Sequence, residues 1–412
     1  MESAKSPVYL HTNYYRAFTM IQRQHTSFLF LVVLLLLLLL LAVHAASITT
    51  QNQANQTSSS PPSSSIKTTS STITSSTIVV NLEELGAIPN DKRADTVRHN
   101  SYLLQSTLNN YTSTSTNNVN VNVYASTYRY LHIIIPDSGT FYLDRGVHVQ
   151  GLHDAIIEIN GRLSFRYDTT HARNNETGTV HRPISCLTFL NTKNVTLTSS
   201  SATSGSIDGG GPKWWGIPYI GYIQRQEDRP YLLLVNHTED MLIEHLLLQD
   251  APYYTLKLSN VDGLEIHGVS IVNRRTRAMS HSFWDLSAFN TDGIDVDGHN
   301  VYVHDVDIWT QDDCIAVKDH GSGGDGISSN MTFERIHASG LGLVIGSIGG
   351  STVRNITFRD SYLYKTVKGI YMKFRGPHYE GGRIEDVMFE NITIESPLQW
   401  PIWIGPAQQV AG

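Results

Sequence analysis

Residues 301–308 read VYVHDVDI, a pattern in which apolar side chains alternate with others and the alternation shifts once in the middle. The apolar positions are Val301, Val303, Val306 and Ile308. Alternation with a period of two indicates a β-strand, and the one extra residue indicates that two strands meet at a bend. The stretch therefore predicts a bent pair of strands with one apolar face.

The same pattern recurs along the second half of the chain. Copies begin at Met241, Leu264, Val301, Met331, Ile356 and Val387, at intervals of 23 to 37 residues. Most copies are followed by a second short strand, at 255–258, 314–317, 343–345, 369–372 and 401–404. Repeats without helical periodicity between them predict coils of a parallel β-helix, in which each coil packs against its neighbours. An antiparallel sandwich is disfavoured because tight hairpin turns are sparse.

The residues before these repeats predict how the solenoid begins. Residues 81–87 indicate a first strand and turn, and a helix that starts near Asp95 would place its apolar residues on one side and cap the open end. Residues 133–135, 141–143 and 155–159 predict the first stacked strands. At the other end the chain stops at Gly412 in the rhythm of an unfinished coil, which favours a C-terminal truncation.

The N-terminal region differs in composition from the rest. Residues 28–43 are an uninterrupted apolar run that follows Lys5, Arg16 and Arg23, which indicates a segment that enters the secretory pathway. We divide the chain into a leader at 1–27, a signal-peptide core or signal anchor at 28–46, a Ser/Thr-rich stalk at 47–78 and a β-helix domain at 79–412. Cleavage and membrane anchorage through 28–43 both remain open.

Charge and cysteine content exclude several classes of protein. The formal net charge is -7, which disfavours a nucleic-acid partner. Two cysteines, Cys186 and Cys314, are too few for a disulfide scaffold or a zinc ribbon, and whether they pair is not evident. Eight Asn-x-Ser/Thr acceptors together with the leader are consistent with a secreted, monomeric glycoprotein.

Stacking predicts where the chemistry lies. If Gly293, Cys314, Gly342 and Gly369 are placed in register, Asp292 and Asp313 fall in one column, with Asp312 beside them. Three close carboxylates do not ionise independently, so at least one should keep its proton at higher pH. Glycoside hydrolysis needs such an acid together with a base. A calcium site and a structural ladder of acidic side chains are the alternatives.

These residues resemble the motifs of glycoside hydrolase family 28, the polygalacturonase family of right-handed β-helices. The stretches 290–295 (NTDGID) and 311–317 (QDDCIAV) are similar to its Asn-Thr-Asp and Asp-Asp motifs. The stretch 340–347 (GLGLVIGS) looks like its Gly-His-Gly block with Leu341 in place of histidine. The stretch 369–373 (GIYMK) looks like its Arg-Ile-Lys block with Tyr371 in place of arginine.

The resemblance implies an all-β, right-handed parallel β-helix and an inverting glycosidase without a metal or cofactor. Asp312 would be the general acid, Asp292 and Asp313 would hold the attacking water, and Lys373 would bind the sugar beside the cleaved bond, next to Tyr371. Inversion leads us to expect the acid and the base ~6.5–9.5 Å apart. Because Tyr371 cannot pair bidentately with a uronate, we expect a glycan less acidic than polygalacturonate.

Several other residues are weaker candidates. Trp214 and Trp215 are either a platform for sugar stacking or buried packing, and Arg274, Arg275 and Arg277 are either an anion-binding rim or a solvated loop. Six histidines lack metal-ligand spacing, namely His281, His299, His304, His320, His337 and His378.

The sequence therefore predicts a secreted or membrane-anchored hydrolase of a pectin-like or other matrix polysaccharide. A glycan-binding protein without activity and a polysaccharide lyase are the alternatives.

Overall fold

The computed structural model describes residues 77–112, 130–168, 173–174, 182–200, 205–216, 229–274, 288–320, 325–375 and 381–407. All of them belong to the second of the two units into which the chain divides, Thr72–Gly412. The leader, the apolar run at 28–43 and nearly all of the stalk lie outside the described residues. Within the described ranges, no helix has the length and apolar character needed to cross a membrane.

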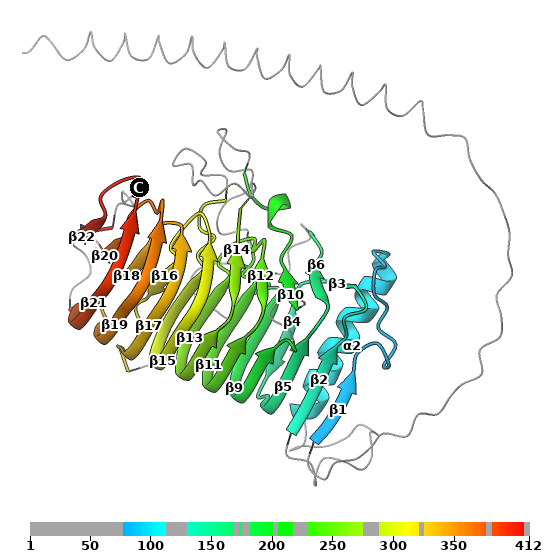
Figure 1. The fold of residues 1–412 in the computed structure, drawn as a ribbon. Coiled ribbons are helices and arrows are strands. Elements are labelled where there is room, and N and C mark those ends of the chain that lie inside the picture. Colours follow the sequence, from blue (N-terminus) through cyan, green and yellow to red (C-terminus); the bar gives the residue numbers. More distant parts are fainter. Residues whose placement is uncertain are drawn as a thin grey trace, which may run out of the picture. The chain divides into compact units, whose positions relative to one another are not determined.

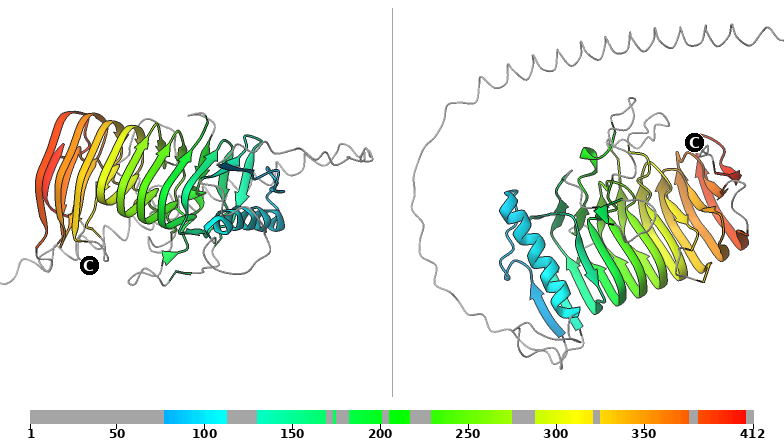
Figure 2. Two further views of the ribbon diagram at one scale, coloured as in Figure 1. Left: turned by 90° about the horizontal axis from the view of Figure 1, so that it is seen from below. Right: turned by 180° about the vertical axis from the view of Figure 1, so that it is seen from behind.

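The predicted parallel β-helix is confirmed, with strands stacked coil upon coil (Figures 1 and 2). The first coils contain β1 (Thr77–Asn81), β2 (Tyr130–Ile135), β3 (Thr140–Leu143), β4 (Val147–Gln150), β5 (His153–Ile159), β6 (Arg162–Phe165), β9 (Leu187–Thr198) and β10 (Ser206–Asp208). The middle coils contain β11 (Leu233–Glu244), β12 (Leu247–Gln249), β13 (Leu256–His267), β14 (Ser270–Val272), β15 (Ile294–Trp309) and β16 (Ile315–Val317). The last coils contain β17 (Ile327–Ser339), β18 (Leu343–Ile348), β19 (Thr352–Tyr364), β20 (Ile370–Phe374), β21 (Arg383–Glu395) and β22 (Ile402–Pro406).

Each long strand pairs in parallel with the strands one coil before and one coil after it. β13, for example, pairs with β11 and with β15. Inside the solenoid, this register places similar side chains directly above one another. The rings of Phe333 and Phe358 lie 4.5 Å apart, and those of Phe358 and Phe389 lie 4.9 Å apart. The apolar positions of the repeated sequence pattern are thus the side chains that fill this interior.

The extra residue of the template is a left-handed turn. The residue before the third apolar position has a positive φ in successive coils: 54° at His245, 58° at Gly268, 53° at Asp305, 51° at Arg335 and 51° at Asp360. A single left-handed residue reverses the in-and-out alternation, so the apolar side chains point inward on both sides of the bend. The sequence pattern and the shape of the coil therefore have one cause.

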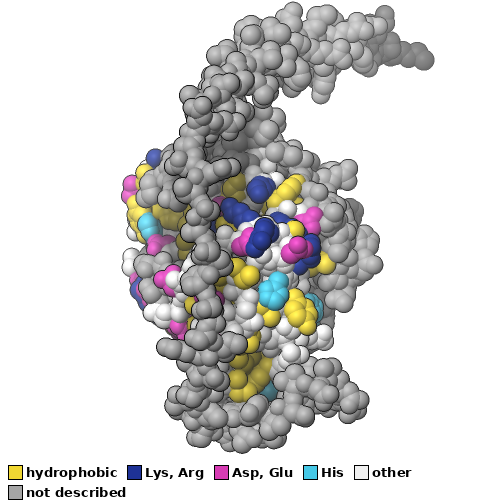
Figure 3. All heavy atoms as spheres, turned by 90° about the vertical axis from the view of Figure 1, so that its right-hand side faces the viewer, with side chains coloured by type: hydrophobic (Ala, Val, Ile, Leu, Met, Phe, Trp, Pro, Cys, Tyr) yellow, Lys and Arg dark blue, Asp and Glu magenta, His cyan; other side chains and the backbone are white. Residues whose placement is uncertain are grey.

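A helix caps the N-terminal end, as predicted. Helix α2 spans Ala94–Thr112, so Asp95 lies in its first turn, and Val97, Leu104 and Leu108 are buried against the first coils. Acidic and basic side chains lie close together on the exposed part of this end (Figure 3), for example in the ion pair of Asp95 and Arg98. The helix thus presents an apolar side to the solenoid, and its solvent side carries one ion pair and the exposed ring of Tyr102.

The structure also adds details that the sequence did not predict. β1 begins at Thr77, two residues inside the segment assigned to the stalk, and β4 and β6 were not foreseen. A short antiparallel pair forms between β7 (Arg173–Asn174) and β8 (Arg182–Pro183), and a 3₁₀ turn, η2, covers Gly211–Lys213. In β21 the inward residues Val387, Phe389 and Ile392 are half-buried, because no described coil stacks beyond them.

Candidate active site

Two turns at the starts of neighbouring coil strands position the acidic residues. Asp292 lies two residues before β15, and Asp312 and Asp313 lie just before β16. The Gly293 amide donates to the carbonyl of Asp313 at 2.9 Å, and the Cys314 amide donates to the carbonyl of Gly342 at 3.0 Å. The register expected from the glycine and cysteine positions is therefore confirmed.

Continuing this register outward defines a column of side chains across five coils. The strand pairings place Tyr254, Asp292, Asp313, Leu341 and Lys368 at equivalent positions. Consecutive members are separated by the spacing of hydrogen-bonded strands, ~4.8 Å. An acidic pair thus lies between an aromatic residue on one side and an apolar and a basic residue on the other.

The three carboxyl groups converge and are almost fully buried. One oxygen atom from each of Asp292, Asp312 and Asp313 lies within 4.8 Å of the others, and the exposed fractions are 2%, 4% and 1%. Asp312 accepts hydrogen bonds from the amides of Asn290 and Asp313, both at 2.8 Å. The nearest oxygen atoms are thus closer together than the ~6.5–9.5 Å expected between the acid and base groups, because Asp292 and Asp313 stack on adjacent coils and Asp312 adjoins Asp313.

Two lysines face these carboxylates. Lys373 Nζ lies 2.7 Å from Asp313 Oδ2. Lys318 Nζ lies 3.4 Å from Asp292 Oδ2, 3.4 Å from Asp313 Oδ2 and 3.2 Å from Asp295 Oδ1. The predicted residue Lys373 therefore does reach the acidic cluster, and Lys318 joins it from β16's end.

The surroundings move the three pKa values in different directions. Burial, followed by the charge of Asp313, raises the pKa of Asp312 to about 6. Burial together with Asp312 and Asp295 raises the pKa of Asp292 well above its usual range. Burial also opposes the charge of Asp313, but Lys373 and Lys318 outweigh it and lower the pKa of Asp313. The cluster therefore combines proton-retaining carboxyl groups with one that stays ionised.

Tyr371 was expected on the outward face together with Lys373. It does lie outside the solenoid interior, but it is only 3% exposed and packs with Ala316 and Val344, with Leu341 and Trp403 at the edge. The ammonium groups of Lys368 and Lys373 lie 4.6 Å and 5.0 Å from the centre of its ring. Where the resemblance would place a histidine and an arginine, the structure has an apolar shelf with two lysines.

The tryptophan and arginine candidates lie elsewhere. Trp214 and Trp215 are 1% and 0% exposed, so the packing interpretation holds. Arg274 donates to the carbonyl of Ser339 at 3.2 Å and lies over the ring of Trp309, while Arg275 and Arg277 lie outside the described residues.

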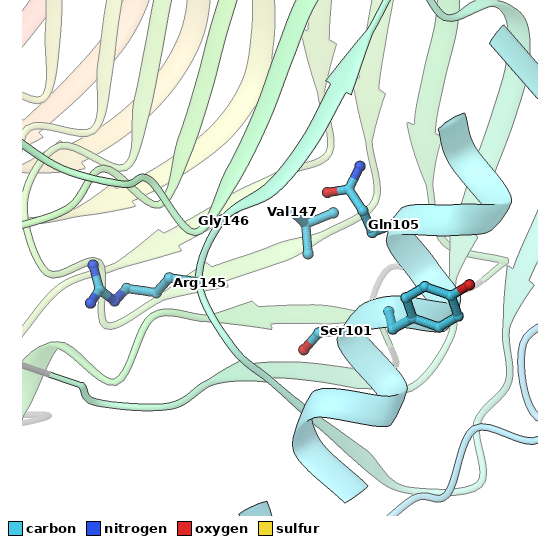
Figure 4. Close-up of a pocket in the computed structure, with 6 residues that line it drawn as sticks. Ser101, Gln105, Arg145, Gly146 and Val147 are labelled. Atoms are coloured by element: carbon cyan, nitrogen blue, oxygen red, sulfur yellow. The ribbon is translucent and has the colours of Figure 1, made fainter. Parts of the chain in front are cut away.

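Two further features carry no catalytic group. Cys186 and Cys314 are buried free thiols and do not pair. A shallow pocket between α2 and β4 is lined by Ser101, Tyr102, Gln105, Arg145, Gly146 and Val147 (Figure 4). Arg145 donates there to the carbonyls of Ile184 and Asp168, so its guanidinium is engaged by the backbone.

Sequence reasoning missed Lys318, Asp295 and Tyr254. Lys318 directly follows the β16 residue Val317, which pairs with Ile345, and the next pair in the stack is Gly346 with Lys373. The two lysines therefore share a column, which the alignment of the second strands would have shown. Tyr254 was missed because only the register between β13 and β15 places it beside Asp292.

Known proteins share sequence patterns and the fold with this chain. A family model for glycosyl hydrolases family 28 matches residues 125–407. Endopolygalacturonase AN8327 of Emericella nidulans is 29% identical over 222 residues, which are 52% of this chain and 53% of that protein. A probable rhamnogalacturonase E of Aspergillus flavus is 26% identical over 194 residues, which are 47% and 37% of the two chains. The chain thus spans about half the length of the curated relatives it matches, or less.

Solved structures show the same fold. Endo-xylogalacturonan hydrolase from Aspergillus tubingensis superposes with a TM-score of 0.57 at 19% identity, covering 77% of this chain and 74% of that one. An exopolygalacturonase from Thermotoga maritima gives a TM-score of 0.55 at 16% identity, covering 76% of each. Since the family model spans well over half of the residues, the chain belongs to glycosyl hydrolases family 28.

Proposed function

We propose that this protein hydrolyses a pectin-like polysaccharide, with Asp312 as the general acid and with Asp292 and Asp313 holding the attacking water. The observation that carries the proposal is the buried cluster in which the pKa of Asp312 is raised to about 6 and that of Asp313 is lowered. A glycosidase needs one carboxyl group that keeps its proton and one that stays ionised. Lys318 and Lys373 already neutralise the cluster, which argues against a calcium ion in the same place.

We propose inversion at the anomeric carbon. Two oxygen atoms within 4.8 Å, one from Asp292 and one from Asp313, can share one water molecule, since each hydrogen bond to it spans ~2.7–2.8 Å. Asp313 supplies the lasting negative charge because Lys373 contacts it at 2.7 Å. The water would then be deprotonated at Asp313 as it attacks, while Asp312 gives its proton to the leaving oxygen.

The polysaccharide would lie along the solenoid axis, across successive coils. On one side of the acids lies the partly exposed ring of Tyr254, which stacks on the buried ring of Tyr253 with ring centres 4.2 Å apart. On the other side lies the shelf, where the partly exposed Leu341 and Trp403 pack against the buried Tyr371. Sugar rings present apolar faces that pack on such surfaces, so neighbouring sugars have a binding surface on both sides of the cleaved bond.

The pKa of Asp312 sets an expected pH dependence. The acid is competent only while protonated, so kcat/KM should fall as the pH rises through about 6. At low pH, kcat/KM should fall only below the usual pKa range of a carboxyl group, because Lys373 and Lys318 keep Asp313 ionised down to that pH. Initial rates from pH 3 to pH 8 would check this, with binding followed separately. A rate that stays constant well above pH 7 would contradict the role of Asp312.

The shelf predicts a preference among pectic substrates. A bidentate arginine–carboxylate contact is charge-assisted, and its absence at Tyr371 should weaken binding of polygalacturonate by roughly one to two orders of magnitude. Polygalacturonic acid should therefore be a poorer substrate than a less acidic pectic polysaccharide. The double change Leu341→His with Tyr371→Arg should raise kcat/KM on polygalacturonic acid. The two single variants serve as controls, and equal wild-type rates on both glycans would refute the preference.

The products distinguish the competing functions. Purified protein is incubated with polygalacturonic acid, rhamnogalacturonan, xylogalacturonan and an algal polysaccharide. New reducing ends of inverted anomeric configuration by NMR would support the proposal, and a retained anomer would refute the water-holding role of Asp292 and Asp313. Ultraviolet absorbance from a new C=C bond would identify a lyase. Binding without any product would identify a non-catalytic glycan-binding protein.

We also propose that the enzyme works as a monomer outside the cell or on its surface. The basic residues before the apolar run at 28–43 and the eight glycosylation acceptors support this location. N-terminal sequencing of the protein recovered from medium and from membranes distinguishes a cleaved signal peptide from an anchor. Recovery of the full chain from the soluble cytoplasm would exclude both.

A further inference from the structure

A ladder of acidic and imidazole side chains lies on the outer side of the second part of the coils, away from the strand starts that carry the catalytic cluster. Strand register places Glu244, His267 and His304 at equivalent positions in three successive coils. The rings of His267 and His304 stack 5.0 Å apart. His245 follows Glu244 at the left-handed bend, with φ of 54°. The solenoid thus brings together ligating groups that are one coil apart in the sequence.

The distances within the first part of this ladder fit a metal ion. Glu244 Oε2 lies 3.2 Å from His267 Nε2 and 3.5 Å from His245 Nε2. Both exceed the ~2.7–2.9 Å of a charge-assisted hydrogen bond. They match the ~3.3 Å between neighbouring ligand atoms around a tetrahedral ion with metal–ligand bonds of ~2.0–2.1 Å. All three ligand atoms lie within 4.8 Å of one another.

Neighbouring side chains orient Glu244 and pack behind His267. The Thr198 hydroxyl donates to Glu244 Oε1 at 2.9 Å, which leaves Oε2 facing the imidazoles. His304, behind His267, contacts Glu265 at 3.2 Å and Asp305 at 2.6 Å with its two nitrogens. The contact with Thr198 therefore orients the Glu244 carboxylate before a metal arrives.

The burial of one ring nitrogen determines which atom of His245 can bind a ligand. His245 Nδ1 is buried and has no hydrogen-bond partner among the described residues, and it packs against Gly268. Only Nε2 is therefore available to a ligand, and it is the atom that faces Glu244.

We propose that Glu244, His245 and His267 bind one divalent ion of the zinc class, which clips two successive coils together. Two imidazoles and one carboxylate suit zinc and its transition-metal neighbours, whereas calcium takes six to eight oxygen ligands. The three side chains are 21%, 41% and 23% exposed, so water can reach the fourth position. The site is separate from the proposed glycosidase chemistry and does not depend on it.

Metal titration of the full chain tests the site. Protein freed of metal with a chelator is titrated with Zn²⁺ by calorimetry and with Co²⁺ by visible absorption, where tetrahedral coordination gives intense bands. We expect one equivalent to bind, and Tm to rise with zinc concentration because only the folded state holds the three ligands together. His245→Ala, His267→Ala and Glu244→Gln should each weaken binding at least about tenfold.

The control is His337→Ala, because His337 is also an exposed histidine beside a carboxylate, 3.0 Å from Asp307, but lies outside the three ligands. It should bind zinc as the wild type does. Glu244→Gln keeps the side-chain shape, so its affinity reports on the metal even if a histidine variant fails to fold.

Two results would overturn the proposal. One is binding that is unchanged in Glu244→Gln and His267→Ala. The other is binding that is lost instead in His320→Ala, whose imidazole lies 3.3 Å from Asp297 and belongs to a different cluster.

Discussion

Asp312→Asn should reduce turnover by a factor on the order of 10² to 10⁴ while substrate binding stays nearly unchanged. The amide keeps the size of the side chain, and its one carbonyl oxygen can accept from the backbone N–H of either Asn290 or Asp313, but it has no acidic proton to give to the leaving oxygen. The effect should therefore appear in kcat and hardly in KM. Steady-state kinetics on the best glycan of the panel, with calorimetric binding of an oligosaccharide, would measure both.

Asp307→Asn is the matched control for this change. Asp307 lies on the same long strand, β15, but is exposed and pairs with His337 rather than with the acidic cluster. Its turnover should equal that of the wild type. If Asp312→Asn kept more than about a tenth of the wild-type turnover, well above the expected range, another residue would have to be the acid.

Lys318→Met should cost ~3–5 kcal/mol of unfolding free energy at neutral pH. The ammonium group lies within 3.4 Å of oxygens from Asp292, Asp295 and Asp313, all of which are nearly fully buried. Without Lys318, Lys373 is the nearest buried cation among the described residues. It contacts only Asp313 of the three carboxyl groups. Buried charge that has lost its partner is strongly destabilising. Denaturant unfolding followed by circular dichroism would measure the loss.

The pH dependence of that loss has a definite sign. In the wild type the pKa of Asp313 is lowered, so its ionised form contributes stability above the pKa of an unfolded aspartate, and this contribution disappears as the pH falls. The difference between wild type and Lys318→Met should therefore be largest near pH 7 and shrink below about pH 4. Lys193→Met, which removes the amine that pairs with the exposed Glu239, is the control and should cost much less. Equal losses in the two variants would show that the acidic cluster does not need Lys318.

The sequence predicted the parts of this molecule that repeat. The alternation with one extra residue predicted the coil because that residue, as at Asp305, is a left-handed turn in every copy. The acidic cluster followed from aligning the strands that start at β15 and β16. Residues whose burial depends on neighbouring coils or on distant segments were harder to predict. The burial of Tyr371 comes from Val344 and Ala316 on neighbouring coils, and that of the two tryptophans comes from segments far apart in the chain.

The column that runs from Tyr254 to Lys368 makes the site modular. Each of its members is contributed by a different coil, and each coil is held mainly by its own interior and by its two neighbours. Under the proposed function, a substitution at Leu341 or Lys368 would therefore alter what is bound next to the cleaved bond without rebuilding the turn that carries the acids. The proposed catalytic residues and the residues that would set the sugar preference can therefore change independently in such a scaffold, one coil at a time.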